Sequence, residues 1–425
     1  MKNKRSMRLI AALGALALVV AACGGDDGGS DFEAGELGAV TVEAGEAIQI
    51  RSLQVITGPD ATLGIPEERA VRLAVEDYGE IHGHAVEVGT GLDDLCSADG
   101  GQAAAQTIVA DDQVVGVIGT SCSGAATAAM PLISDDGMVM ISGSNTSPAL
   151  TSDLAGTAGS DYHVGYYRTA HNDLIQGAAA ANFMYTELGL ENVALIHDGD
   201  PYTQGLTTAF ENAFVELGGT ITVHTSIPKG TTDAAPVLTE VAGTTPEGVF
   251  MPIFIAEATA IAQQKGSVAG LEDVVFMGAD GILSPAFIEE VPESVDFYFS
   301  GPDVRFGDNT NEATGVNAEQ FLEAYNAEWN EAPTAPFWAH AYDATTLLLQ
   351  AIENVAVVDG DVIHIDRQAL RDELNAVSGF AGIIGSLTCD EFGDCGAAAI
   401  TVIQNTDNNY ANATENVVYS YVPEG

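Results

Sequence analysis

Short apolar segments alternate with amphipathic segments along the first part of the chain, from about Ala47. The apolar segments have the length of strands, whereas apolar residues in the segments between them recur at the period of a helix. The pattern predicts strands at 48–56, 85–89, 114–118 and 138–141, and helices at 66–78, 101–110 and 125–133. Pro66 is expected in the first turn of its helix. This alternation is typical of a parallel sheet covered by helices.

The same rhythm restarts after Arg168. It predicts helices at 173–188, 203–217, 234–241 and 256–267, and strands at 193–197, 220–225, 248–253 and 273–277. The last third adds helices near 317–329, 337–354 and 366–377 and a β-region from Gly385 onward. A chain of 425 residues is too long for one small core. Two such runs therefore predict an α/β protein with two lobes of similar build.

The N-terminal segment has the pattern of an export signal. Residues 1–8 carry four basic side chains and no acid, and the apolar run at 9–22 is too short to span a bilayer. Small residues then precede Cys23, and this junction resembles the lipobox of bacterial lipoproteins, in which the cysteine is lipidated. We expect a signal peptide at 1–22, and a lipidated Cys23 that begins a flexible tether at 23–46. The alternative is a secretory signal with an incidental cysteine.

Acidic residues far outnumber basic ones. The chain has 61 Asp plus Glu against 13 Lys plus Arg, a formal net charge of −48. A phosphate backbone needs a basic face, so nucleic acid is excluded as a partner. An anionic membrane surface would also repel the chain, so we expect membrane contact through the lipid anchor only. The charge fits either a cationic ligand or a solvated acidic surface suited to a saline habitat, and we favour the second.

The remaining four cysteines fit an oxidising compartment. Proximity in the sequence favours the pair Cys389–Cys395, across a turn-like segment, which leaves Cys96–Cys122 as the second disulfide. The rival is a metal site. It is disfavoured because the chain has no CxxC pair and no histidine close in sequence to these cysteines. We therefore expect two disulfides and no bound metal.

Sequence motifs of enzymes are absent. The chain contains no G-x-S-x-G, H-E-x-x-H, P-loop or G-x-G-x-x-G motif. The segment 119–124 is close to a nucleophile motif, but Ser123 stands where the nucleophile elbow requires a glycine. The eight histidines are scattered, and single histidines are more often structural than catalytic. We expect no catalytic residue and no cofactor; an extracellular hydrolase is the less favoured alternative.

Several short segments carry a resemblance to a known family. They are 57–59, 93–96, 117–123, 141–151, 168–169, 197–202, 276–281, 341–344 and 385–388. In this order and spacing, from about Ile48 to the end of the chain, they resemble the periplasmic leucine/isoleucine/valine-binding proteins of ABC transporters. The resemblance implies the type I periplasmic binding protein fold, in which two Rossmann-like lobes with parallel-type sheets are joined by a three-crossing hinge.

The resemblance also implies where the lobes divide. Crossings are expected near His171, Val304 and Ile384. Lobe 1 would then comprise residues 47–171 plus 304–384, and lobe 2 residues 172–303 plus 385–425.

The resemblance implies a site for an amino-acid head group. Ser123 matches the serine that binds the ligand carboxylate, and Ser144 and Thr146 match a backbone contact and a side-chain contact to the same head group. Ser123 also stands at the start of a predicted helix, where a hydroxyl, free amides and the helix dipole favour an anion, although a plain N-cap is the alternative. Asp280 matches the acidic residue that pairs with the ligand ammonium, and Tyr202 an aromatic that lines the site. Both follow predicted strands, where open α/β sheets bind ligands; without the family, Asp280 would be a solvated loop acid.

The side-chain half of the implied site departs from the family. Leu63 and Phe254 stand where tyrosines are usual, Asp280 is one methylene shorter than the usual glutamate, and Phe337 keeps the family's phenylalanine. The resemblance therefore implies a small amino acid, branched-chain or otherwise aliphatic, as the ligand. An aromatic ligand and a non-amino-acid amide or carboxylate are alternatives.

The implied role is that of a solute-binding lipoprotein. We expect a monomer, anchored to the outer face of the cell membrane, that delivers its ligand to an ABC transporter permease. A ligand-sensing receptor module of the same fold is the alternative.

Overall fold

The computed structural model describes residues 32–396 and 398–423. The predicted signal peptide at 1–22 and the predicted lipidation site, Cys23, lie outside these residues. Within the part that is described, none of the helices combines the length and the apolar character needed to cross a membrane.

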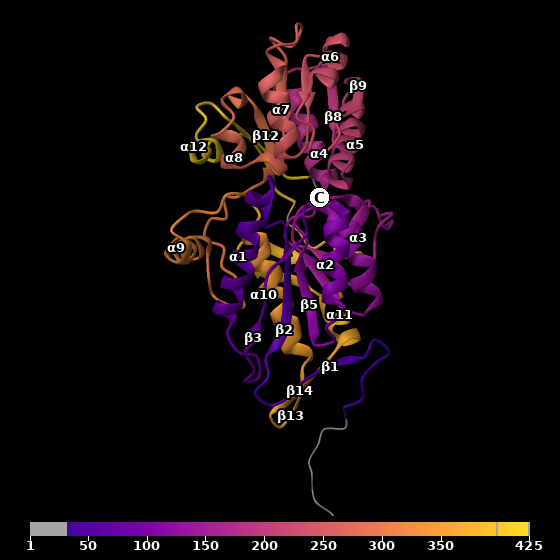
Figure 1. Cartoon of the computed structure of the whole chain (residues 1–425), viewed down its shortest axis with the longest axis vertical. Helices are drawn as coiled ribbons and strands as arrows, with labels where there is room; N and C mark the ends of the chain where they lie inside the picture. Colours follow the sequence, from indigo (N-terminus) through magenta and orange to yellow (C-terminus); the bar gives the residue numbers. More distant parts are fainter. Residues whose placement is uncertain (1–31, 397, 424–425) are drawn as a thin grey trace, which may run out of the picture. The chain divides into compact units, whose positions relative to one another are not determined.

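The first sheet consists of six parallel strands (Figure 1). They lie in the order β3 (Val86–Glu87), β2 (Ile48–Gln54), β5 (Val114–Gly119), β6 (Val139–Ser142) and β7 (Tyr166–Arg168), with β4 (Leu92–Asp93) paired to β2. Every residue of β5 is buried, as expected of a strand covered on both faces. Helices α1 (Ala61–Tyr78) and α10 (Trp338–Val355) pack on this sheet in one hydrophobic core, which we call the first core. Helices α2 (Ala98–Ile108) and α3 (Ser123–Asp135) share a separate core with the sheet. We call this sheet and its helices the first lobe.

The second sheet has seven strands, and five of them are parallel. They lie in the order β9 (Thr220–Ser226), β8 (Asn192–His197), β10 (Gly248–Phe250), β11 (Val275–Gly278) and β12 (Tyr298–Pro302), followed by antiparallel β17 (Ile400–Gln404) and β18 (Val417–Tyr421). Its helices are α4 (Asp173–Asn182), α5 (Pro201–Glu216), α6 (Ala235–Gly243), α7 (Ile255–Lys265), α8 (Pro285–Ile288) and α12 (Tyr410–Glu415). We call this sheet and its helices the second lobe. The predicted α/β class with two sheets of parallel type is confirmed.

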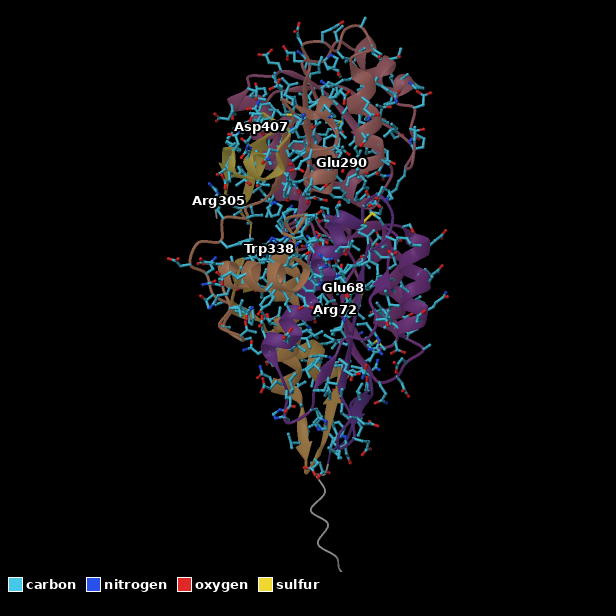
Figure 2. All side chains as sticks on the ribbon, turned by 60° about the vertical axis from the view of Figure 1, so that its left-hand side comes forward. Glu68, Arg72, Glu290, Arg305, Trp338 and Asp407 are labelled. Carbon is cyan, nitrogen blue, oxygen red and sulfur yellow. A yellow bond between two sulfur atoms is a disulfide. The ribbon has the colours of Figure 1, made fainter. Side chains whose placement is uncertain are left out.

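The exposed face of α1 shows how the amphipathic pattern is used. Glu68 and Arg72 lie one turn apart and form an ion pair of 2.5 Å (Figure 2). On the other side of the helix, Ala70 and Ala74 are fully buried in the first core. The pair stabilises the helix by only a few tenths of a kcal/mol. Burial of the apolar face is therefore the main reason that this segment is helical.

Proline 66 lies inside α1 and not in its first turn, contrary to the prediction. Because a proline has no N–H, the carbonyl of Thr62 loses its usual partner four residues on. The hydroxyl of Thr334 donates a hydrogen bond of 2.7 Å to that carbonyl. This side chain from a distant segment lets the helix begin five residues earlier than Pro66, at Ala61.

The prediction of a flexible tether over 23–46 is wrong for Ala39–Val42. These residues form β1, which pairs antiparallel with β14 (Val362–Asp366), itself paired with β13 (Val357–Asp359). Val40 and Val42 are each 2% exposed and belong to the first core. The alternation of apolar residues over four positions is a strand pattern, but the acidic and glycine-rich surroundings conceal it.

The third crossing is not at Ile384, as predicted, but follows Cys395. The hairpin of β15 (Ser378–Gly382) and β16 (Gly385–Thr388) stays with the first lobe, and Leu387 and Cys395 are buried in its core. The amide groups of Ile383 and Ile384 donate to the carboxylate of Asp343 in α10, at 3.0 and 2.9 Å. The chain then returns to the second lobe at β17. The first core also includes residues of α9 (Ala318–Trp329) and α11 (Arg367–Asn375).

Candidate ligand-binding site

One cavity brings together all eight residues predicted to bind a ligand. It is also lined by Ser121, Cys122 and Gly281. The first lobe contributes five of the eight predicted residues, namely Leu63, Ser123, Ser144, Thr146 and Phe337. The second lobe contributes the other three, namely Tyr202, Phe254 and Asp280. Their role in binding stays a prediction, but the structure places them where a single small molecule would touch them all.

Ser123 reaches the cavity from the end of a buried strand. The chain leaves β5, and α3 begins at Ser123 itself. The residue at the N-cap is Cys122, whose side chain makes no capping hydrogen bond. Ser123 Oγ accepts a long bond of 3.4 Å from the amide of Ser147. Ser123 is therefore not a plain N-cap, and its hydroxyl lies at a helix N-terminus, where free amides and the helix dipole attract an anion.

The loop after β6 holds Ser144 and Thr146 in a fixed position. The hydroxyl of Ser142 accepts hydrogen bonds from the amides of Ser144 and Asn145, at 3.2 and 2.9 Å. The hydroxyl of Ser144 donates to the carbonyl of Ser121, at 3.0 Å. Ser144 and Thr146 are 6% and 1% exposed. Hydroxyl groups therefore gather on the first-lobe side of the cavity.

Asp280 faces them from the second lobe, directly after β11. Its Oδ1 accepts hydrogen bonds from the hydroxyl of Tyr202 at 2.6 Å and from Nε2 of Gln176 at 3.1 Å. Burial, and then the charge of Asp280, raise the pKa of Tyr202 well above its usual value, so this phenol remains a donor. Among the described residues, Oδ2 of Asp280 has no hydrogen-bond partner. The 3% exposed carboxylate thus offers one free oxygen in a cavity that it lines.

Two further buried acids near the site were missed by sequence reasoning. Glu67 is fully buried and accepts a bond of 2.8 Å from the hydroxyl of Ser121, and burial raises its pKa to about 8. Among the described residues, neither carboxyl oxygen of Asp173 has a hydrogen-bond partner. Burial, followed by the charge of Asp280, raises the pKa of Asp173 well above the usual value. Both carboxyl groups are therefore easier to protonate than those of ordinary surface acids. An acid in a predicted helix looks like a surface residue, so no sequence signal marks them.

Apolar side chains complete the cavity. Leu63, Phe254 and Phe337 are each less than 8% exposed, and the rings of Phe254 and Tyr202 lie 5.6 Å apart. The lining, with hydroxyl groups and a carboxylate beside apolar side chains, suits a small molecule with a polar head and a short apolar part.

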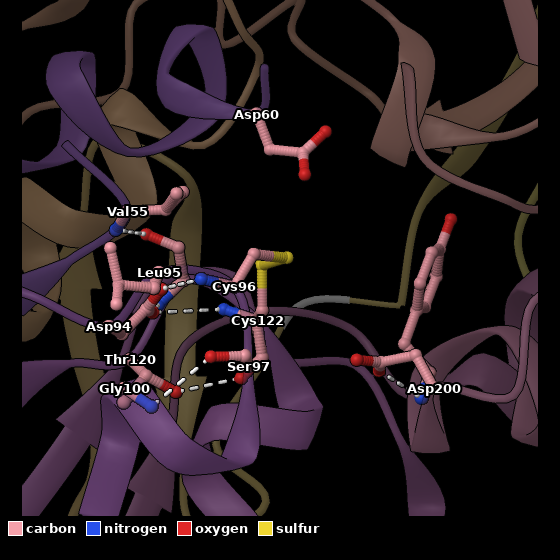
Figure 3. Close-up of a disulfide and its surroundings, with 12 residues drawn as sticks. Val55, Asp60, Asp94, Leu95, Cys96, Ser97, Gly100, Thr120, Cys122 and Asp200 are labelled. Carbon is pink, nitrogen blue, oxygen red and sulfur yellow. Dashed lines mark hydrogen bonds between the residues drawn. A yellow bond between two sulfur atoms is a disulfide. The ribbon is translucent and has the colours of Figure 1, made fainter. Parts of the chain in front are cut away.

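Both predicted disulfides are present, and one of them borders the cavity. Cys96 is bonded to Cys122 and Cys389 to Cys395. Figure 3 shows the first disulfide beside Asp94, whose carboxylate accepts bonds from the amides of Cys96 and Ser121, at 2.7 and 2.8 Å. The disulfide and this buried carboxylate fix the segment that leads into α3.

Comparison with known proteins agrees with the predicted family. A model of the family described as periplasmic binding protein matches residues 47–401. The leucine-, isoleucine-, valine-, threonine-, and alanine-binding protein of Pseudomonas aeruginosa is 26% identical over 358 residues, which is 83% of this chain and 88% of that protein. The leucine-specific-binding protein of Salmonella typhimurium is 26% identical over 82% of this chain and 88% of its own length.

Solved structures show the same fold. The leucine-binding protein LivK from Thermotoga maritima superposes with a TM-score of 0.73 at 24% identity, over 85% of this chain and 97% of that one. The type 1 periplasmic binding protein from Bordetella pertussis has the same TM-score at 18% identity, over 85% and 97% of the two chains. Because the family model matches most of the chain, this protein belongs to the periplasmic binding protein family, and its fold is the type I fold of that family.

Proposed function

We propose that this protein is the extracytoplasmic solute-binding component of an ABC transporter and that it binds a small amino acid, branched-chain or otherwise aliphatic. The observation that carries the proposal is the free oxygen of Asp280, which lies in one cavity with the hydroxyl groups of Ser123, Ser144 and Thr146. A zwitterionic head group needs an anionic contact at one end and hydrogen-bond donors at the other. This cavity offers both.

The first lobe would bind the carboxylate of the amino acid. Ser123 supplies a hydroxyl and the start of α3 supplies unpaired amide groups, so the negative charge is stabilised without a basic side chain. Thr146 adds a hydroxyl from a loop that is already held in place by Ser142. The hydroxyl of Ser144 donates to the carbonyl of Ser121 and so holds this loop against the segment before Ser123. Because this half of the site is built within one lobe, it can bind the ligand before the lobes close.

The second lobe would bind the ammonium group. Tyr202 and Gln176 orient Asp280 through its Oδ1, so Oδ2 is available to the ligand. Closure removes water from both charges of the ligand while pairing each of them. A buried charge without a partner is costly, so a molecule that lacks either charge would lose most of the gain. An α-amino acid is therefore favoured over a simple amine or a simple carboxylate.

The apolar half of the cavity favours an aliphatic side chain. Leu63 and Phe254 have no hydroxyl, so a polar ligand side chain would be left without partners there. The relatives above are named for binding leucine, isoleucine, valine, threonine and alanine. Except for threonine, whose side chain carries a hydroxyl, these amino acids are the class of ligand that this chemistry favours.

Delivery to a permease completes the proposed role. We infer that the protein is a monomeric lipoprotein, attached through Cys23, and that its closed form docks on the membrane-embedded permease. The acidic surface, with a formal net charge of −48 for the chain, would match a basic patch on that permease. A permease without such a patch on its outer face would contradict this part of the proposal.

The test of the ligand class is a thermal-denaturation screen of the purified protein with each of the common amino acids and several carboxylates that lack an amine. A ligand that binds only the folded state stabilises it by RT ln(1 + [L]/Kd), about 2.7 kcal/mol at 100 times Kd. We expect the melting temperature to rise with aliphatic amino acids and to stay unchanged with the amine-free carboxylates. A rise caused only by amine-free compounds would refute the amino-acid proposal.

A further inference from the structure

A lysine of the second lobe bonds to the first lobe at the disulfide that borders the cavity. Lys229 follows β9, and its Nζ donates a hydrogen bond of 2.7 Å to the carbonyl oxygen of Cys96. The same Nζ lies 3.5 Å from Oδ2 of Asp200 in its own lobe. Only one other lysine, Lys265, occurs among the residues that the structure describes. A cation is therefore used here in a chain that has few of them.

Lys229 also packs on a residue that lines the ligand cavity. Its Nζ lies 4.1 Å from the centroid of the ring of Phe254, within the range of a cation–π interaction. Phe254 lines the cavity. A ligand packed against this ring would thus help to fix the ring on which Lys229 rests.

The acceptor of the lysine is fixed in turn by covalent structure. Cys96 is bonded to Cys122, the residue before Ser123, and its amide donates to Asp94 at 2.7 Å (Figure 3). The carbonyl that receives Lys229 is therefore tied to the start of α3, where the ligand carboxylate would bind. Movement of the second lobe away from this point must break the bond from Lys229.

Two other contacts show that the lobes meet closely near Lys229. The carboxylate of Asp60 in the first lobe accepts a bond of 3.4 Å from the amide of Ile255, which begins α7 in the second. A Cβ placed on Gly124 would lie 2.4 Å from Oδ2 of Asp200, so the second lobe leaves no room there for a side chain. These contacts surround Lys229 with groups from both lobes.

We propose that Lys229 is a latch residue: its bond to the Cys96 carbonyl holds the lobes closed and slows the release of the ligand, and its stacking on Phe254 of its own lobe positions the ammonium group for that bond. The ligand part of this inference rests on the proposed function, whereas the closure part does not. The bond to Cys96 joins the two lobes, so it exists only when they are closed. The ammonium group becomes hydrated on opening, and its attraction to the ring is then weakened by water. Lys229 is a positioning residue in this scheme and does not touch the ligand.

The experiment compares Lys229→Met with Lys265→Met. Both replacements remove an ammonium group that stacks on aromatic rings, but Lys265 stacks on Phe276 and Phe297 in the core of its own lobe. Small-angle X-ray scattering of each purified variant without ligand reports opening as a larger radius of gyration. We expect an increase for Lys229→Met, a wild-type value for Lys265→Met, and a smaller increase for Lys229→Arg. Circular dichroism checks that each variant is folded.

A second measurement follows the release of the amino acid that gives the largest thermal stabilisation in the screen. We expect release from Lys229→Met to be about tenfold faster than from wild type, as the loss of one charged hydrogen bond implies, with Lys265→Met unchanged. A radius of gyration and a release rate equal to wild type in Lys229→Met would overturn the latch. If no amino acid binds to wild type, the proposed function fails, and the scattering comparison alone still decides whether Lys229 holds the lobes together.

Discussion

Replacing Asp394 by Asn tests a buried ion pair that ties the last part of the first lobe to its sheet. The side chain of Arg168, at the end of β7, has no exposed surface, and its Nη2 lies 2.5 Å from Oδ2 of Asp394. That oxygen also accepts bonds from Asn172 at 2.9 Å and Thr151 at 3.1 Å. The amide of an asparagine can keep the shape and a carbonyl acceptor, so the replacement mainly removes the charge.

The expected loss is large because the arginine stays buried. Removing one partner of a buried ion pair lowers the free energy of unfolding by roughly 3–5 kcal/mol. Because the asparagine keeps a carbonyl oxygen that can accept from Arg168, we expect a loss of about 3 kcal/mol, at the lower end of this range. Asp303→Asn is the matched control: its partner Arg305 is 53% exposed, and exposed pairs contribute about 0–1 kcal/mol. Urea unfolding followed by tryptophan fluorescence measures the difference, because Trp338 lies in the first core and Trp329 packs against it.

The same carboxylate predicts how stability depends on pH. Burial alone would raise the pKa of Asp394, but the Arg168 guanidinium and the three hydrogen bonds hold it below its usual value. Its contribution is therefore complete above the unfolded-state pKa of about 3.9 and is lost as the pH falls through the lower, folded-state pKa. Wild type should lose more stability than Asp394→Asn in this acidic window. Equal costs for the two Asn variants at pH 7, or parallel pH profiles, would refute the reasoning.

Two further replacements test the packing of α1 and the binding site. Thr334→Val leaves the carbonyl of Thr62 without the partner that replaces the missing N–H of Pro66, so urea unfolding should show a loss of about 1 kcal/mol; no loss would mean that water takes over the bond. Tyr202→Phe removes the hydroxyl that donates to Asp280, so calorimetry should show that the affinity for the amino acid falls about tenfold. An unchanged affinity would contradict the proposed orientation of Asp280.

Local sequence patterns predict the alternation of strands and helices well, because each buried strand and amphipathic helix carries its own period. The predicted strand at 114–118 and helix at 125–133 correspond to β5 and α3, to within two residues at each end. Elements that depend on distant partners are predicted poorly. The start of α1 depends on Thr334, and β1 depends on β14, which lies more than 300 residues away in the sequence.

The residues of the candidate site also differ in whether the sequence predicts them. Asp280 and Tyr202 follow predicted strands, and the resemblance to a family assigns them a role, so the cavity could be anticipated. Asp173 and Gln176 could not, because their significance comes from their burial beside Asp280 and not from any local motif. A pattern of residues predicts where a strand ends, but not which distant side chains are buried against it.

The central claim is that Asp280 binds the ammonium group of an amino acid. The most direct measurement is isothermal titration calorimetry of wild type and Asp280→Asn with the best amino acid from the thermal screen and with its deaminated analogue. The account predicts that the amino acid binds wild type about 100-fold more tightly than Asp280→Asn, and that the analogue binds both proteins weakly and almost equally. If the replacement leaves amino-acid affinity unchanged, or if wild type binds the analogue as tightly as the amino acid, the claim is wrong.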